Sequence, residues 1–138
     1  MKQPLRIEGK KHRDARGNLK YNNNFDASKV KRVYTISNTI ENPARGWQGH
    51  KIESRWFSCI KGSFKVSLIA IDDWDTPSEV LPKKEFHLSS ETLDVLYTPP
   101  GYASRLEMLE LDSILLAMGD YALGAADDEY KYDLEYFN

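Results

Sequence analysis

The sequence predicts an all-β fold, an antiparallel β-sandwich or jelly roll, and three observations support this prediction. Short segments in which apolar and polar residues alternate recur along the whole chain, which is typical of strands with one buried face. Turn-forming glycine, proline, asparagine and aspartate residues separate these segments. No helical periodicity lies between them, so the strands are expected to pair antiparallel. The 138 residues predict a single domain, residues 1–138.

Each strand is expected from its own pattern. Residues 29–38 are rich in β-branched and aromatic side chains, and Gly62 allows a tight hairpin turn at residues 61–63. The acidic, tyrosine-rich tail after Gly124 is expected to form a short helix. The other predicted strands are residues 5–9, a strand following the turn at 14–19, and residues 47–52, 54–60, 64–71, 83–89 (an edge strand), 92–101 and 105–120.

Alternation also predicts which side chains share a face. Arg55, Phe57 and Cys59 fall on one face of their strand, and Gln48 and His50 fall on one face of the preceding strand. If Phe57 and Cys59 line the interior, Arg55 lies inside it near the mouth. A buried arginine is costly unless it meets an anion or a polar ligand.

Composition excludes several classes of function. A formal net charge of −2 gives no electrostatic reason to expect binding to nucleic acid or to an anionic membrane. The longest apolar runs are too short to span a membrane, and no leader pattern opens the chain. One cysteine, Cys59, precludes an internal disulfide. We therefore expect a cytoplasmic protein whose partner is a small molecule.

Several motifs, weak alone but shared in order, resemble two related enzyme families. The segments "DARGNL", "KRVYTI" and "RGWQGHK" resemble motifs of the sugar-nucleotide 3,4-ketoisomerases. The segments "KGSFKVSLIAIDDWDTPSE", "LSSETLDVLYTPPGYAS" and "GDYALGAADDEYKYD" resemble motifs of the dTDP-4-keto-6-deoxyhexose 3,5-epimerases. This resemblance implies a WxcM-like cupin, a double-stranded β-helix that forms a homodimer. It also implies a metal-free reaction on a thymidine-diphosphate 4-keto-6-deoxy sugar.

The chain departs from both families at positions that matter for chemistry. Gln48 stands where the ketoisomerases have the first of two histidines and where the epimerases have their catalytic histidine, while His50 keeps the second. Ser104 replaces another epimerase histidine, and Leu116 aligns with the epimerase tyrosine. Arg55 aligns with a lysine of their pocket. The positive charge is thus kept while the usual acid–base pair is not.

Three residues are candidates for catalysis by proton transfer next to a ketone. His50 could act as the base, because an imidazole titrates near neutral pH; it could instead be a buried histidine bonded to a backbone carbonyl. Gln48 could orient a sugar oxygen or be a structural amide. Arg55 could stabilise an enolate oxygen or form an ion pair with Glu53 or Glu107.

Four residues are candidates for substrate binding. Arg45 and Arg16 match arginines of the family motifs, which implies contact with the nucleotide or its phosphates, although a surface position is the alternative. Tyr34 could relay a proton or pack in the core. Tyr102, expected in a loop beside the mouth, could stack on thymine or sugar.

No metal and no other cofactor are expected. Metal-binding cupins use two histidines and a glutamate from one motif and a histidine from a second. Gln48 and Ser104 occupy two of these positions, which leaves His50 and Glu53. Two ligands of four make a poor site for zinc or iron.

Two classes of function remain open. The first is an isomerase or epimerase of a nucleotide-linked 4-keto sugar that supplies surface-polysaccharide synthesis. The second is a non-catalytic binder of sugar nucleotides or carbohydrates that kept the fold and lost turnover. The retention of both His50 and Arg55 favours the enzyme.

Overall fold

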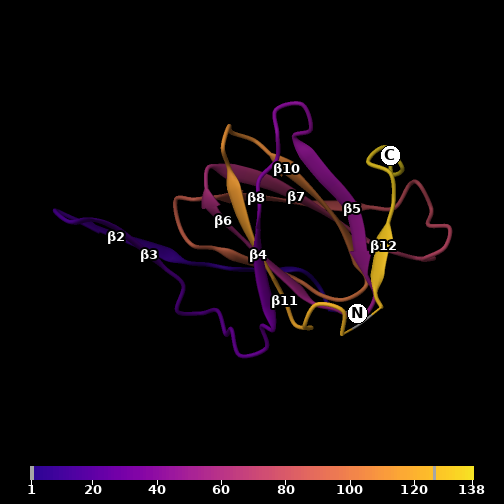
Figure 1. Ribbon diagram of the computed structural model, residues 1–138, viewed down its shortest axis with the longest axis horizontal. Helices are drawn as coiled ribbons and strands as arrows, with labels where there is room; N and C mark the ends of the chain where they lie inside the picture. Colours follow the sequence, from indigo (N-terminus) through magenta and orange to yellow (C-terminus); the bar gives the residue numbers. More distant parts are fainter. Residues whose placement is uncertain (1, 126) are drawn as a thin grey trace.

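The computed structural model describes residues 2–125 and 127–138, and strands dominate these residues (Figure 1). None of them forms a helix that is long and apolar enough to cross a membrane. The strands are β1 (Leu5–Ile7), β2 (Lys10–Asp14), β3 (Gly17–Tyr21), β4 (Arg32–Ile36), β5 (Ala44–His50), β6 (Arg55–Lys61), β7 (Ser63–Ala70), β8 (Lys83–Ser89), β9 (Val95–Thr98), β10 (Tyr102–Met108), β11 (Ile114–Gly119) and β12 (Glu129–Lys131).

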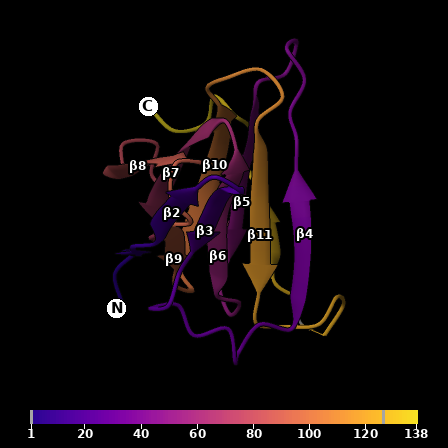
Figure 2. The ribbon, with the colours of Figure 1, turned by 90° about the vertical axis from the view of Figure 1, so that its left-hand side faces the viewer.

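The strands form two five-stranded sheets and a separate hairpin. The first sheet has the order β1-β9-β6-β11-β4 and the second has the order β12-β5-β10-β7-β8. Every pairing is antiparallel, as the sequence predicts. In Figure 2, β4 stands at the outer edge of the first sheet beside β11. The predicted edge strand at residues 83–89 is confirmed, because β8 ends the second sheet.

The main core lies between the two sheets. Phe57 and Cys59 of β6 enter it from the first sheet, and Phe64, Val66 and Leu68 of β7 enter it from the second. Each of these side chains is at most 2% exposed. The predicted inner face of residues 54–60 is therefore confirmed, and the turn at Gly62, where φ is 72°, joins the two strands that supply it.

Two smaller apolar clusters cover the outer faces of the sheets. Trp56 of β6 belongs to a cluster on the first sheet with Val95 and Met118. Trp47 of β5 belongs to a cluster on the second sheet, where the ring of Phe137 meets it edge-on with centroids 5.2 Å apart. The C-terminal tail is thus fixed by aromatic packing.

The tail corrects one expectation. The predicted helix after Gly124 is wrong for the described residues, because residues 129–131 form β12 and pair with β5. Residue 126 of this segment lies outside the described residues. Pairing places Glu129 opposite His50 and Lys131 opposite Gln48, so the tail borders the candidate active site.

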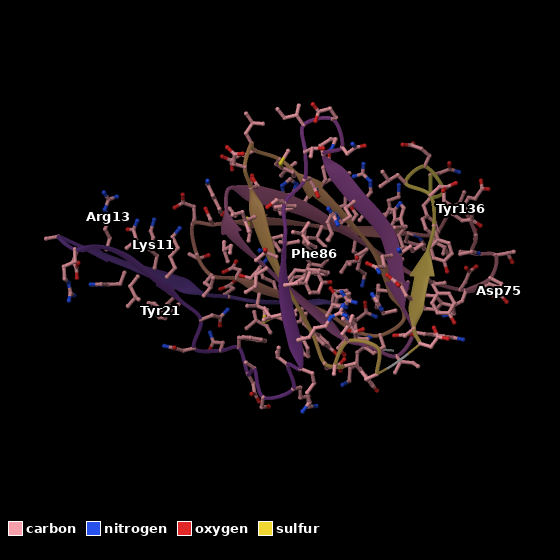
Figure 3. All side chains as sticks on the ribbon, viewed as in Figure 1. Lys11, Arg13, Tyr21, Asp75, Phe86 and Tyr136 are labelled. Atoms are coloured by element: carbon pink, nitrogen blue, oxygen red, sulfur yellow. The ribbon has the colours of Figure 1, made fainter. Side chains whose placement is uncertain are left out.

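The hairpin of β2 and β3 extends away from the two sheets (Figure 1). Figure 3 shows Lys11 and Arg13 on this hairpin, at the opposite end of the molecule from Tyr136 in the tail. The predicted turn between the two strands is confirmed. It carries Arg16 well outside the core.

Candidate active site

A bulge in β5 determines which of its side chains face the space between the sheets. In the pairing with β10, Ser104 lies opposite Gln48 but Arg105 lies opposite Gly46, so one residue of β5 is left over. The extra residue shifts the alternation of the strand. Arg45, Gln48 and His50 consequently all line one cavity of about 140 Å³, which we call the β5 cavity. The shared face predicted for Gln48 and His50 is confirmed.

The other walls of the β5 cavity come from neighbouring strands. They are Tyr34, Thr35 and Ile36 of β4, Arg55 and Phe57 of β6, and Ser104 and Leu106 of β10, together with Gly46. Five of the seven predicted site residues therefore meet here: His50, Arg55, Gln48, Arg45 and Tyr34. Leu116 does not, because it packs in the cluster on the outer face of the first sheet. The tyrosine that lines the cavity is Tyr34 of β4.

Arg55 is held by two groups. Its guanidinium faces the Glu53 carboxylate, with Nε 3.2 Å from Oε1 and Nη2 donating to Oε2 at 3.4 Å. Its Nη1 donates to the Tyr34 hydroxyl, and the guanidinium lies 5.6 Å from the centre of the Tyr34 ring. Arg55 therefore forms the ion pair with Glu53 and also lines the cavity, so both alternatives expected for it are realised. Glu107 pairs instead with Lys65 and Arg105.

Glycine at position 119 makes room for this ion pair. Gly119 of β11 lies opposite Arg55 of β6, and a Cβ atom at Gly119 would overlap the Glu53 Oε1 atom. A residue with a side chain there would push the carboxylate from its place. Glu53 and Arg55 are only 7% and 5% exposed, so the displaced charge would have little access to water.

His50 is a neutral imidazole at neutral pH. Burial lowers its pKa to about 4, and the positive charge of Arg55 acts in the same direction. Nδ1 lies 3.7 Å from Glu53 Oε2 and 3.8 Å from Asp128 Oδ2, and no described residue forms a hydrogen bond with it. The expected alternative, a side chain bonded to a backbone carbonyl, is thus not realised at Nδ1. A neutral imidazole has the protonation state that a base requires.

Asp128 organises the loop after β5. Its carboxylate accepts hydrogen bonds from the backbone N–H groups of Lys51, Ile52 and Glu53, at distances of 2.7 to 3.0 Å. This contact fixes the turn that places His50 and Glu53 side by side. No local sequence pattern indicates this role of Asp128, since its partners lie 75 to 77 positions away.

A second cavity of about 350 Å³, which we call the tail cavity, adjoins the first at His50 and Arg55. Four carboxylates and two guanidinium groups line it, so its net charge is negative. Arg32, whose guanidinium lies 5.1 Å from the centre of the Tyr34 ring, belongs to it and was missed among the site candidates. Its place in the "KRVY" motif was an available signal. The remaining lining residues are Glu53, Tyr121, Ala122, Leu123, Gly124, Asp127, Asp128 and Glu129.

Two predicted binding residues lie elsewhere. Arg16 is on the tip of the hairpin, its side chain 89% exposed, and pairs with Asp14 at 2.7 Å. Tyr102 was expected in a loop beside the mouth, which is wrong: it begins β10, is 4% exposed and belongs to the main core. Gln48, by contrast, lines the β5 cavity and also donates a hydrogen bond to Glu129 of β12.

Comparisons with known proteins agree with this architecture. The sequence profile of the family described as FdtA, WxcM-like, C-terminal, matches residues 5–138. A search of curated protein sequences finds no match.

Three solved structures represent the structural relatives. The QdtA 3,4-ketoisomerase from Thermoanaerobacterium thermosaccharolyticum, a double mutant in complex with TDP, has a TM-score of 0.68 and 24% identity, covering 97% of this chain and 91% of that one. The dTDP-4-dehydrorhamnose 3,5-epimerase from Bacillus anthracis, with TDP and PPi bound, has a TM-score of 0.75 and 13% identity. The match covers 95% of this chain and 79% of the epimerase chain. ChmJ, a 3'-monoepimerase from Streptomyces bikiniensis in complex with dTDP-quinovose, has a TM-score of 0.72 and 16% identity, covering 95% and 70%.

At these identities the structural likeness establishes the fold, a cupin jelly roll. The family follows from the profile, which spans nearly the whole chain and includes every residue of both cavities. The protein is a member of the WxcM-like C-terminal (FdtA) family.

Proposed function

We propose that this protein is an isomerase or epimerase of a nucleotide-linked 4-keto-6-deoxy sugar, with thymidine diphosphate as the nucleotide. The observation that carries the proposal is the meeting of His50, Arg55, Gln48 and Tyr34 in one cavity. Membership of the FdtA family supports the same class of substrate.

The proposed reaction begins with removal of a proton from a carbon next to the C4 ketone. His50 accepts this proton, and the electron pair of the C–H bond moves into an enolate whose negative charge rests on the former carbonyl oxygen. Arg55 and Gln48 donate hydrogen bonds to that oxygen. Return of a proton to the opposite face gives an epimer. Proton movement between the oxygens and carbons of the enediol gives the isomeric ketone.

Each participant has a property suited to this role. His50 is neutral, as a base must be. Arg55 cannot lose its charge at any working pH, and Glu53 holds its orientation. Tyr34, whose hydroxyl accepts a hydrogen bond from Arg55, is positioned to return a proton. Catalysis in this scheme requires no metal.

The nucleotide part of the substrate is assigned to the arginines outside the reacting centre. Arg45 lines the β5 cavity and is proposed to contact the diphosphate. Arg16 is too far out on the hairpin to join it within one chain, so we propose that a second copy supplies it in a homodimer. The open outer edge of β4 offers backbone groups for such pairing. We place the reaction in the cytoplasm, supplying surface-polysaccharide synthesis.

Proton exchange measured by NMR tests this proposal. The protein, in deuterated buffer with EDTA, is mixed with dTDP-4-keto-6-deoxyglucose, and the C3 and C5 proton signals are followed. We expect one signal to disappear, and His50→Ala to slow its loss at least 100-fold while circular dichroism stays unchanged. Retention of every proton at high protein concentration would overturn the proposal for this substrate.

A non-catalytic sugar-nucleotide binder is the second candidate. It is favoured by the hydrogen bond from Gln48 to Glu129 and by the engagement of Arg55 with Glu53 and Tyr34, which occupy these donors within the protein. A binder would hold the nucleotide sugar with the same affinity in wild type and His50→Ala, and neither would exchange protons. Calorimetric titration of both proteins distinguishes the two functions.

A further inference from the structure

Three potential metal ligands converge where the two cavities meet. Nδ1 of His50 and one carboxylate oxygen each from Glu53 and Asp128 all lie within 4.8 Å of one another. The three residues are between 3% and 8% exposed. His50 and Glu53, at the end of β5 and in the loop that follows it, occupy two of the ligand positions of the metal-binding cupins, whereas Asp128 comes from the C-terminal tail and is not part of that pattern.

The distances suit a shared cation better than direct hydrogen bonds. Nδ1 lies 3.7 Å from Glu53 Oε2 and 3.8 Å from Asp128 Oδ2, beyond hydrogen-bond range. Three ligands spaced evenly around a cation, each about 2.1 Å from it, would lie about 3.6 Å apart. A cation could therefore be accepted with only small movements of the side chains.

Supporting contacts already orient both carboxylates. The Arg55 guanidinium contacts both oxygens of Glu53, Oε1 through Nε and Oε2 through Nη2, and backbone N–H groups hold Asp128. Such secondary contacts fix ligand geometry at metal sites. The three N–H groups make four contacts with the Asp128 carboxylate, two to each oxygen, because the Ile52 N–H is shared between Oδ1 and Oδ2.

One buried ligand atom of the cluster has unused bonding capacity. Among the described residues, Nδ1 of His50 has no hydrogen-bond partner, whereas Glu53 Oε1 already lies 3.2 Å from Arg55 Nε. A buried polar atom like Nδ1 ordinarily has a partner. The adjoining tail cavity carries net negative charge and, at about 350 Å³, has room for the water molecules that would complete a coordination shell.

We propose that His50, Glu53 and Asp128 form a site for a divalent transition-metal cation such as Zn²⁺. An imidazole nitrogen with two carboxylate oxygens suits such ions, whereas Mg²⁺ prefers an all-oxygen shell and gives up water reluctantly. Bound at Nδ1, the cation leaves the ring proton on Nε2. If His50 is the base of the proposed function, the cation therefore acts as an inhibitor.

Calorimetric titration of the EDTA-treated, dialysed protein with ZnCl₂, without any sugar nucleotide, tests the site. We expect one Zn²⁺ per chain and no comparable heat from MgCl₂. Glu53→Gln, Asp128→Asn and His50→Ala should each weaken binding at least tenfold. Asp127→Asn is the matched control, since Asp127 lines the same cavity but is exposed and outside the cluster, and it should bind as wild type does.

A second readout does not depend on activity. Co²⁺ bound by one nitrogen and carboxylate oxygens gives visible absorption, which should appear with wild type and be lost with His50→Ala, a change that breaks no hydrogen bond at Nδ1. Absence of Zn²⁺ binding in wild type would overturn the proposal, as would binding that survives in all three cluster variants. Binding without inhibition of proton exchange would retain the metal site and contradict His50 as the base.

Discussion

Replacing Glu53 by alanine leaves the Arg55 guanidinium buried without its carboxylate partner. Arg55 is 5% exposed and its Nε lies 3.2 Å from Glu53 Oε1, so the carboxylate is the group that balances its buried charge. Removal of one partner from a buried ion pair costs about 3 to 5 kcal/mol of unfolding free energy. For a chain of 138 residues the entropy of unfolding is about 0.29 kcal/mol per kelvin, so the lower figure corresponds to a fall of about 10 °C in Tm.

The assay is urea unfolding followed by circular dichroism, with Tm as a second measure. The double variant Glu53→Ala/Arg55→Met should lose less free energy than the sum of the single variants, because it leaves no unpaired charge. Glu85→Ala is the control: Glu85 pairs with Lys65 at 3.3 Å but is 52% exposed, and its loss should cost under about 1 kcal/mol. A similarly small cost for Glu53→Ala would refute the reasoning, since it would mean that water screens the Arg55 charge.

Three further predictions concern other parts of the molecule. Burial and the charge of Arg55 lower the pKa of His50 to about 4, so kcat/KM for proton exchange in EDTA should stay level from pH 8 to about pH 5 and fall at lower pH. A decline in kcat/KM centred near pH 6.5 would contradict this pKa. Burial raises the pKa of the Cys59 thiol to about 11, so Ellman's reagent at pH 8 should label native protein at least about 100-fold more slowly than urea-unfolded protein, and equal rates would be inconsistent with this burial. Phe137→Ala should cost about 3 kcal/mol of unfolding free energy and shift Trp47 fluorescence to the red, whereas an unchanged Tm would argue against the docked tail.

The strands could be predicted because their signal is local. Within each segment, the alternation of apolar and polar residues indicates which side chains are buried, and turn residues mark where the segment ends. The core positions of Phe57 and Cys59 follow from this alternation alone. The tail was mispredicted because its composition is polar. Its strand depends on pairing with β5 and on aromatic contacts such as that of Phe137 with Trp47.

The candidate site could be predicted only in part, because some of its residues are placed by contacts between segments far apart in the sequence. Gln48, His50 and Arg55 were found from alternation and motif order. Arg45 enters the cavity through a bulge in β5, which alternation along an uninterrupted strand cannot anticipate. Asp128 touches the loop after β5 only through long-range folding, so neither its role in positioning nor the three-ligand cluster is visible in the sequence.

Gln48 cannot take up a proton, so in the proposed reaction His50 carries the only imidazole among the described residues that line the two cavities. The chain has three histidines, and the other two, His12 and His87, are exposed on other strands. The His50 ring borders both cavities, one containing hydrogen-bond donors and the other containing carboxylates. A proton on Nδ1 would be stabilised by Glu53 and Asp128 and would leave Nε2 to act as the base, whereas a cation on Nδ1 would leave the proton on Nε2 and remove that base. The occupant of Nδ1 would therefore decide whether the site is catalytic, and measuring proton exchange with and without Zn²⁺ in one preparation would separate a regulated enzyme from a scaffold that has lost its chemistry.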